Sequence, residues 1–580
     1  MNLRDRALVG ILSVALIGLS IAALAPTLQS SSNGEVQPTT PPVVEGGRYV
    51  EGVLGRATNA NPFGARSAAD RGLVALLFRG LVRLGPGNAI VGDLAQRWEV
   101  SDSGRTWTFH LRDGLFWQDG VPLTADDVAF TVGVLSDPSY PGPGGDSWRD
   151  VTATVTDERT VVLHLTTPLG GFLQAATQPI APAHLLDGIP LEALGDDPFG
   201  QQPIGSGPFR LVYLNAARAL LAVATPIDGL PEDPGGPNFA TPPATDSLAS
   251  AKATPKPAAA VPYLSSIEIR YYDDVAALRK DWDAGELDAA SGLQPADAAA
   301  LGATPGARLV KYPETTLLAA ALNLRGGGDD FADPKVRKAL LAAIDRDTIV
   351  KDVLAGLGKR ADSLIPPSSP MFDASVSAPI VYDPAAARKG LTDAGWKSSS
   401  TGWTPKGASA PIVIEVLCPE ETANPVAYAV AQKLVDGWHA IGLSAKLTPL
   451  PAAELLGDRL TRGDYQVAVL PFAIGLDPDL YPLLAASQTR TGGSNVIGLQ
   501  DPDLDKLLVA ARSPVDEVER VAAYKALEQR LGDRAYMLPI AFRDEAVVFR
   551  DTVTGPESRP IGSAGDRYWD VLIWRLADGS

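Results

Sequence analysis

Histidine and cysteine are few in this sequence, and their spacing matches neither a metal-binding nor a nucleophilic motif. The four histidines are His110, His164, His184 and His439, and none stands at metal-ligand spacing with another histidine or an acid. Two lie on expected strands and one on a helix face, so we predict structural roles. The single cysteine, Cys418, rules out an intrachain disulfide and is expected to be a small buried side chain.

Motifs for acyl transfer and nucleotide hydrolysis are also missing. There is no Gly-x-Ser-x-Gly elbow, and 205–207 (Gly-Ser-Gly) does not complete one. Gly358-Lys359 lacks the glycine spacing and the Ser/Thr of a Walker A loop. Acidic pairs such as 126–127 and 329–330 stand at helix starts, where the helix dipole favours them. We therefore expect no enzyme, no catalytic residue, no cofactor and no resident metal, and any energy for transport would come from another chain.

Length and charge narrow the class further. The chain of 580 residues exceeds what one hydrophobic core usually serves, so at least two lobes are expected. Its formal net charge of −18 argues against nucleic acid or an anionic membrane surface as a partner, because both require clustered Lys and Arg.

The N-terminal sequence has the features of a targeting segment. An uncharged run, 7–25, follows two arginines and as a helix would span roughly 28 Å, close to the bilayer core of about 30 Å. We predict a membrane anchor at 1–25, with a cleavable signal peptide as the alternative because Ala23-Leu24-Ala25 resembles a cleavage site. Residues 26–47, rich in Pro, Ser and Thr, are expected to form a tether. Both alternatives place the folded part outside the cytoplasm, tethered or secreted.

From residue 48 the pattern is mixed α/β. Strands are expected at 105–111, 159–165, 267–272, 412–417 and 466–470. A capping box predicts a helix over 125–135, and Asp-Pro or Asn-Pro pairs predict helices over 334–354, from 384 to about 395 and from 425. Ser513-Pro514 with Asp516 predicts a last long helix that ends near 532. A Pro/Ala-rich stretch, 225–261, is expected to be a surface insertion.

Several segments in order resemble family 5 of the extracellular solute-binding proteins, which serve ABC importers of oligopeptides, dipeptides and nickel. The similarity covers about 48–549. The matching segments are 81–84, 91–100, 103–114, 117–120, 122–128, 203–209, 333–340, 343–346 and 382–396.

The resemblance implies an α/β fold of the periplasmic-binding-protein type, with two lobes around a central cleft and an extra subdomain on the first lobe. The first lobe would comprise 48–310 plus 535–580, and the second 311–534. The chain would cross between them near 311–322 and 535–542, and ligand binding would close the lobes about this hinge.

The sequence departs from the family at one informative loop. Peptide-binding relatives carry an Asp-Tyr-Pro-Asp-Pro-type loop whose first carboxylate pairs with the ligand's α-amino group. Aligned on 477–479 (Asp-Pro-Asp), the loop here places Ile474 at that position. The loss of one hydrogen bond to a charged group costs roughly 1.5–3 kcal/mol, so an α-amino anchor is not expected here. The family's Asn-Pro-x-Tyr-Trp segment is also replaced, by the insertion.

Candidate ligand contacts follow from the segments that would face the cleft. Arg325 would pair with a carboxylate, Phe472 would stack on a side chain, and Asp477 would cap a helix or meet a cation. The full set is Asn61, Phe63, Asn323, Arg325, Phe472 and Asp477.

The resemblance predicts an extracytoplasmic substrate-binding protein, expected to be a monomer. It would capture a peptide-like or other small solute and deliver it to an ABC permease with separate ATPase subunits. Two alternatives stay open: a surface-anchored sensor, adaptor or chaperone of the same fold, and a surface hydrolase.

Overall fold

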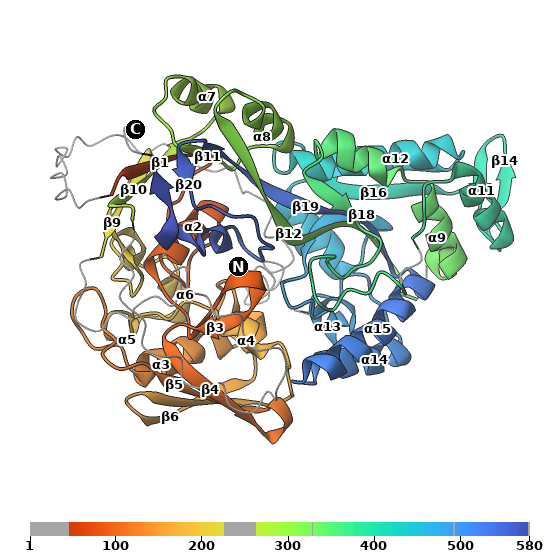
Figure 1. Ribbon diagram of the computed structural model, residues 1–580. Helices are drawn as coiled ribbons and strands as arrows, with labels where there is room; N and C mark the ends of the chain where they lie inside the picture. Colours follow the sequence, from red (N-terminus) through yellow and green to blue (C-terminus); the bar gives the residue numbers. More distant parts are fainter. Residues whose placement is uncertain (1–45, 225–262, 327–328, 377–378, 491–492, 578–580) are drawn as a thin grey trace.

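The computed structural model describes residues 46–224, 263–326, 329–376, 379–490 and 493–577 (Figure 1). The apolar segment 1–25, almost all of the 26–47 tether and the 225–261 insertion lie outside the described residues, so the expectations for them stay predictions. Within the described ranges, no helix combines the length and the apolar character needed to cross a membrane.

One eleven-stranded sheet runs through both halves of the molecule, in the order β17-β16-β18-β12-β19-β11-β1-β10-β9-β8, with β13 pairing on β19. Strands β12 (Ala307–Leu322) and β19 (Met537–Arg550) are long and lie antiparallel at its centre. On one side of them the first lobe holds β1 (Arg48–Leu54), β8 (Phe209–Leu214), β9 (Arg218–Val223), β10 (Ser266–Tyr272) and β11 (Ala289–Ser291). On the other side the second lobe holds β16 (Val413–Pro419), β17 (Ser444–Leu450) and β18 (Val467–Ala473). Two central strands therefore join two lobes, which is the predicted fold class.

The two-residue period of β12 separates two cores in the second lobe. Leu318, Ala320 and Leu322 pack on one face of the sheet, with α9 (Pro334–Ala342), α11 (Pro384–Asp393) and α12 (Pro425–Ala440). The alternate residues Leu317, Ala319 and Ala321 pack on the other face, with α14 (Pro502–Arg512) and α15 (Glu517–Arg534). A strand buried on both faces reads as a continuous apolar run, which explains why 317–322 shows no polar alternation.

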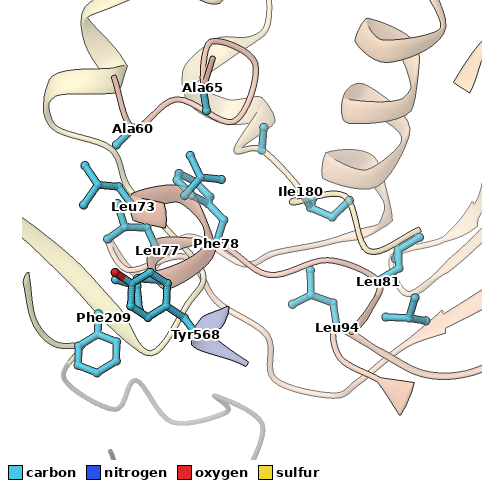
Figure 2. Close-up of a cluster of buried hydrophobic side chains, with 14 of the residues drawn as sticks. Ala60, Ala65, Leu73, Leu77, Phe78, Leu81, Leu94, Ile180, Phe209 and Tyr568 are labelled. Atoms are coloured by element: carbon cyan, nitrogen blue, oxygen red, sulfur yellow. The ribbon is translucent and has the colours of Figure 1, made fainter. Parts of the chain in front are cut away.

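The first lobe is built in the same way on β19. Val547 and Phe549 face the large core of this lobe, whereas Val548 faces a smaller cluster under α7 (Val275–Asp283) and α8 (Pro295–Gly302). The large core includes α2 (Ala68–Leu77), and Figure 2 shows Tyr568 from the C-terminal segment beside Leu77 of that helix. The C-terminal segment up to Leu576 thus completes the core of the first lobe.

A separate four-stranded antiparallel sheet extends the first lobe at the bottom of Figure 1. It has the order β4-β5-β7-β6, from β4 (Ala95–Ser101), β5 (Thr106–Leu111), β6 (Val151–Asp157) and β7 (Thr160–Leu165). Helix α3 (Ala125–Ser136) packs beside it and begins with the predicted capping box of Thr124 and Asp127. This sheet occupies the place where the resemblance implies an extra subdomain.

One helix prediction requires correction, and another differs from the structure by two residues at its end. The helix expected over 334–354 is interrupted after α9, because Asp345 caps a new short helix by accepting the Thr348 amide at 3.0 Å. The last long helix begins after Asp516 and continues past Gly532 to Arg534, where Ala535 closes it at a φ of 46°. Sequence reasoning also missed α14, although Asp501-Pro502 is the same start signal as in α9, α11 and α12.

Candidate functional site

The pairing of β12 with β19 breaks at the junction of the two lobes. Register is continuous from Ala307 to Pro313 and resumes at Leu317, so 314–316 form no ladder pairs with β19. The backbone of Thr315 forms hydrogen bonds outside this ladder. Its N–H donates to the Ile561 carbonyl at 3.2 Å, and its carbonyl accepts from the Ile474 N–H at 3.2 Å. A segment of the first lobe and a loop of the second lobe therefore meet at the break. It falls inside the crossing expected at 311–322; the lobe boundaries themselves stay a prediction.

Charged side chains gather at this break. Arg543 donates two hydrogen bonds to Glu314, from Nε at 3.0 Å and from Nη2 at 2.9 Å. Two residues along β19, Glu545 lies 3.8 Å from Arg567, which also pairs with the fully buried Glu51 of β1 at 2.6 Å. We name Glu51, Glu314, Arg543, Glu545 and Arg567 the junction cluster.

Burial sets the electrostatics of the junction cluster. Desolvation raises the pKa of Glu545 to about 7, with the nearby Arg567 acting in the opposite direction. The Glu314 carboxylate raises the pKa of Arg543, and burial raises the pKa of Tyr568, whose hydroxyl bonds to Glu51 at 3.1 Å. Burial strengthens the ion pairs among these side chains, so they hold the segments that meet at the junction in a fixed arrangement.

Asn61 and Phe63 lie inside the first lobe. Both are fully buried, and Asn61 donates to the Leu194 carbonyl at 2.7 Å and accepts from the Phe63 amide at 3.0 Å. The Phe63 ring packs edge-on against Phe130 and Tyr140. These contacts hold the loop after β1 in place; a role in ligand contact stays a prediction.

Asn323 and Arg325 are brought together at the far end of β12. Asn323 Nδ2 donates to the carbonyls of Gly463 and Tyr465, both at 2.8 Å, and Arg325 Nη1 donates to the Val496 carbonyl at 2.6 Å. Both side chains thus bind loops of the second lobe. The expected pairing of Arg325 with a ligand carboxylate also stays a prediction.

Phe472 and Asp477 lie closer to the junction. Phe472 pairs with Leu317 across β12 and β18, and its side chain is buried in the second lobe. Asp477 accepts a 2.5 Å hydrogen bond from Arg520, so the cation that it meets in this structure belongs to the protein. Its other oxygen faces Gly171 of the first lobe. The structure therefore brings Asp477 against the opposite lobe.

Ile474 is buried in the apolar cluster of the second lobe, with 7% of its surface exposed. Its amide bonds to Thr315 at the junction. The position at which the family resemblance predicts an amine anchor is thus next to the junction, and its side chain offers no charge.

Sequence reasoning missed the junction cluster. A signal was present: Arg543-Asp544-Glu545 interrupts an otherwise apolar strand, and Glu314 follows Pro313 between two apolar runs. Charges inside such strands require partners, but the partner of Glu314 lies 229 positions away, so the sequence does not name it.

The structure shows the surroundings of two side chains considered for catalysis or metal binding. His184 pairs with Asp119 at 2.9 Å, and burial raises the pKa of the Cys418 thiol to about 12. Among the described residues, no group of three or more His, Cys, Asp or Glu side chains is arranged to hold a metal ion.

Two lobes that share one sheet and are joined by two crossing strands define the class of two-lobed periplasmic binding proteins. The model of the bacterial extracellular solute-binding proteins, family 5, matches residues 89–494, and the chain belongs to this family.

Curated relatives span nearly the whole chain. The glutathione-binding protein GsiB of Salmonella typhi is 25% identical over 508 residues, covering 86% of this chain and 89% of the relative. The dipeptide-binding protein of Escherichia coli K12 is 27% identical over 501 residues, covering 82% and 84%.

Solved structures share the fold. The oligopeptide-binding protein AppA from Bacillus subtilis, in complex with a nonapeptide, aligns with a TM-score of 0.71 at 21% identity, over 92% of this chain and 99% of that one. The substrate-binding protein CtaP from Listeria monocytogenes aligns with a TM-score of 0.73 at 23% identity, over 92% and 100%.

Proposed function

We propose that this protein captures a short peptide-like solute between its lobes and delivers it to an ABC permease that works with separate ATPase subunits. Membership of family 5 carries the proposal. Glutathione and a dipeptide, named for two curated relatives, are both small peptides with charged ends. The junction cluster lies where the two lobes meet, which is where the proposal places the solute.

The solute is held without an α-amino anchor at position 474. Ile474 is apolar and buried, and Asp477, three residues on, is already paired with Arg520. Recognition then rests on other parts of the solute, so blocking its amine should change affinity little.

Calorimetric titration of the full-length chain in detergent tests both statements. The probes are reduced glutathione, alanyl-alanine and N-acetyl-alanyl-alanine. We expect saturable binding of at least one free peptide and a change of less than about threefold on acetylation of the dipeptide, if the dipeptide binds. An amine anchor would instead cost about ten- to 150-fold on acetylation.

A broader measurement covers solutes outside these probes. Any solute that binds the folded state raises its melting temperature in proportion to the logarithm of its concentration. No shift with a panel of peptides, sugars and metal chelates, together with no retained solute in native mass spectrometry, would contradict the proposed function.

We further infer that the protein works as a monomer outside the cytoplasm, tethered by residues 1–47. The uncharged run 7–25 after Arg4 and Arg6 supports the anchor. Recovery of the intact N-terminal peptide from the membrane fraction is expected, whereas a mature N-terminus at residue 26 would show cleavage. Light scattering coupled to size exclusion checks the monomer.

A further inference from the structure

The two lobes also touch at a second place, outside the crossing strands. The loop between β7 and α4 (Phe172–Ala175) of the first lobe lies against the turn between α14 and α15 of the second lobe. Gly170 N–H donates to the Arg512 carbonyl at 2.8 Å, which joins the backbones of the two lobes directly. Val515 of the same turn packs against the core of the first lobe.

Two consecutive glycines permit this approach. A Cβ atom on Gly171 would lie 1.2 Å from Asp477 Oδ2, and one on Gly170 would lie 1.7 Å from the Pro514 carbonyl oxygen. Gly171 has a φ of −85° and a ψ of 11°, a backbone conformation that other residues adopt. The requirement for glycine at 171 therefore comes from the opposite lobe and not from the turn itself.

The surface of the second lobe at this contact is held firmly. Asp477 is paired with Arg520 at 2.5 Å, and Asp479 is paired with Arg512 at 3.0 Å. Tyr524 donates to the Pro478 carbonyl at 3.2 Å between the two pairs. All four charged side chains are mostly buried, so the loop presents Asp477 in one position.

We propose that Gly171 and Asp477 form a closure contact, which stabilises the closed arrangement of the lobes without touching the solute. Asp477 is then a positioning residue for closure: one carboxylate oxygen is bound by Arg520, and the other faces the glycine of the opposite lobe. Because any stabilisation of the closed state is present before a solute arrives, the contact sets the closed population of the empty protein and the apparent affinity. The link to affinity rests on the proposed function.

Distance measurement between two spin labels on the full-length chain in detergent tests the closure contact with no solute present. The labels are placed at Thr156→Cys on β6 and Val509→Cys on α14, both exposed, while the buried Cys418 stays unlabelled. We expect a short-distance population in the unsubstituted background, and a loss of at least half of it in Gly171→Ala.

A double substitution separates the contact from general damage. Removal of the Asp477 carboxylate leaves its Cβ 3.1 Å from the new methyl group, which a small shift accommodates. Gly171→Ala/Asp477→Ala should therefore regain closed population relative to Gly171→Ala alone. Gly133→Ala, on a helix with open space around it, is the matched control and should behave like the background.

Three outcomes would overturn the closure contact: no closed population in the background, an unchanged distribution in Gly171→Ala, or no recovery in the double variant. If the single variant closes less and still melts at the background temperature, misfolding is excluded as the cause. Failure of every variant to bind a solute bears on the proposed function alone, because the distance measurement uses none.

Discussion

Arg543 of β19 donates two parallel hydrogen bonds to Glu314 of β12, at 3.0 and 2.9 Å, where both strands pass from one lobe to the other. The two residues are 229 positions apart and meet only because the strands are antiparallel neighbours. A fork-shaped guanidinium suits this place, because its two bonds fix an orientation as well as a charge.

Loss of this ion pair should destabilise the protein more than a surface pair would. Arg543→Met leaves Glu314, which is only 12% exposed, without its cation, and we expect a loss of about 1–3 kcal/mol in the free energy of unfolding. Arg543→Lys should lose less, because it keeps the charge but not the fork. Chemical denaturation checks both. Arg279→Met, from an exposed helix pair with Asp283, is the control and should change stability by less than about 0.5 kcal/mol.

Glu545 should give the protein a stability that falls as the pH rises. Its pKa is raised to about 7 in the folded state, above the ordinary value of 4.5, so the folded chain holds the proton more tightly than the unfolded chain. The resulting stability is fully present below about pH 4.5 and is lost as the pH rises through 7. Glu545→Gln removes this contribution.

Urea unfolding at pH 5 and pH 8 measures the effect as a difference. The wild-type protein should lose more stability between the two pH values than Glu545→Gln does. Part of the slope will remain in the variant, since burial also raises the pKa of Asp570 to about 7. Equal slopes in the two proteins would contradict the assignment, and Glu192→Gln on the surface serves as the control.

Local signals in the sequence predicted several of the helix starts in the second lobe. Asp333-Pro334 and Asn424-Pro425 start α9 and α12 as expected, since the N-cap bond and the fixed φ of proline act within a few residues. The expected helix 334–354 was wrong at 343–345 because Asp345 offered a competing cap there. Neighbouring residues decide where helices start, whereas long helices end where such competition or packing stops them.

The candidate site was much harder to predict from the sequence than the helices around it. Glu314, Arg543 and Glu51 come together through the order of strands in the sheet, which no local pattern specifies. Reasoning from cleft-facing segments selected residues such as Asn61, whose polar groups hold a loop in place and whose role in ligand contact stays a prediction. A polar side chain after a strand serves backbone carbonyls as readily as it serves a ligand, and the sequence does not distinguish the two uses.

The contacts of Arg337 give a structural reason for one of the segments that resemble the family. It is 3% exposed, and its guanidinium donates to the carbonyls of Phe331, Ala332, Arg534 and Ala535. It thereby joins the start of α9 to the end of α15. We expect Arg337→Lys to lower the free energy of unfolding by about 2–4 kcal/mol, because lysine cannot reach all of these acceptors. Lys335→Arg, exposed on the same helix, should be neutral in the same denaturation series.

Substitutions of Asn323 and Arg325 distinguish a structural role of these residues from a role in ligand contact. Asn323 holds the Gly463 and Tyr465 carbonyls, and Arg325 holds Val496 while its side chain lies against Gly498. If these bonds are the main function of the pair, Asn323→Ala should cost about 1–3 kcal/mol of stability through unsatisfied carbonyls. The affinity for whichever peptide probe binds should then change by less than about twofold. Ligand contact by Arg325 predicts the reverse for Arg325→Ala: a loss of tenfold or more in affinity, with recovery in Arg325→Lys if a single charge suffices. Denaturation and calorimetry on the same three variants distinguish the two roles. A loosened loop lowers the free energy of unfolding, whereas a missing ligand contact lowers only the affinity for the peptide.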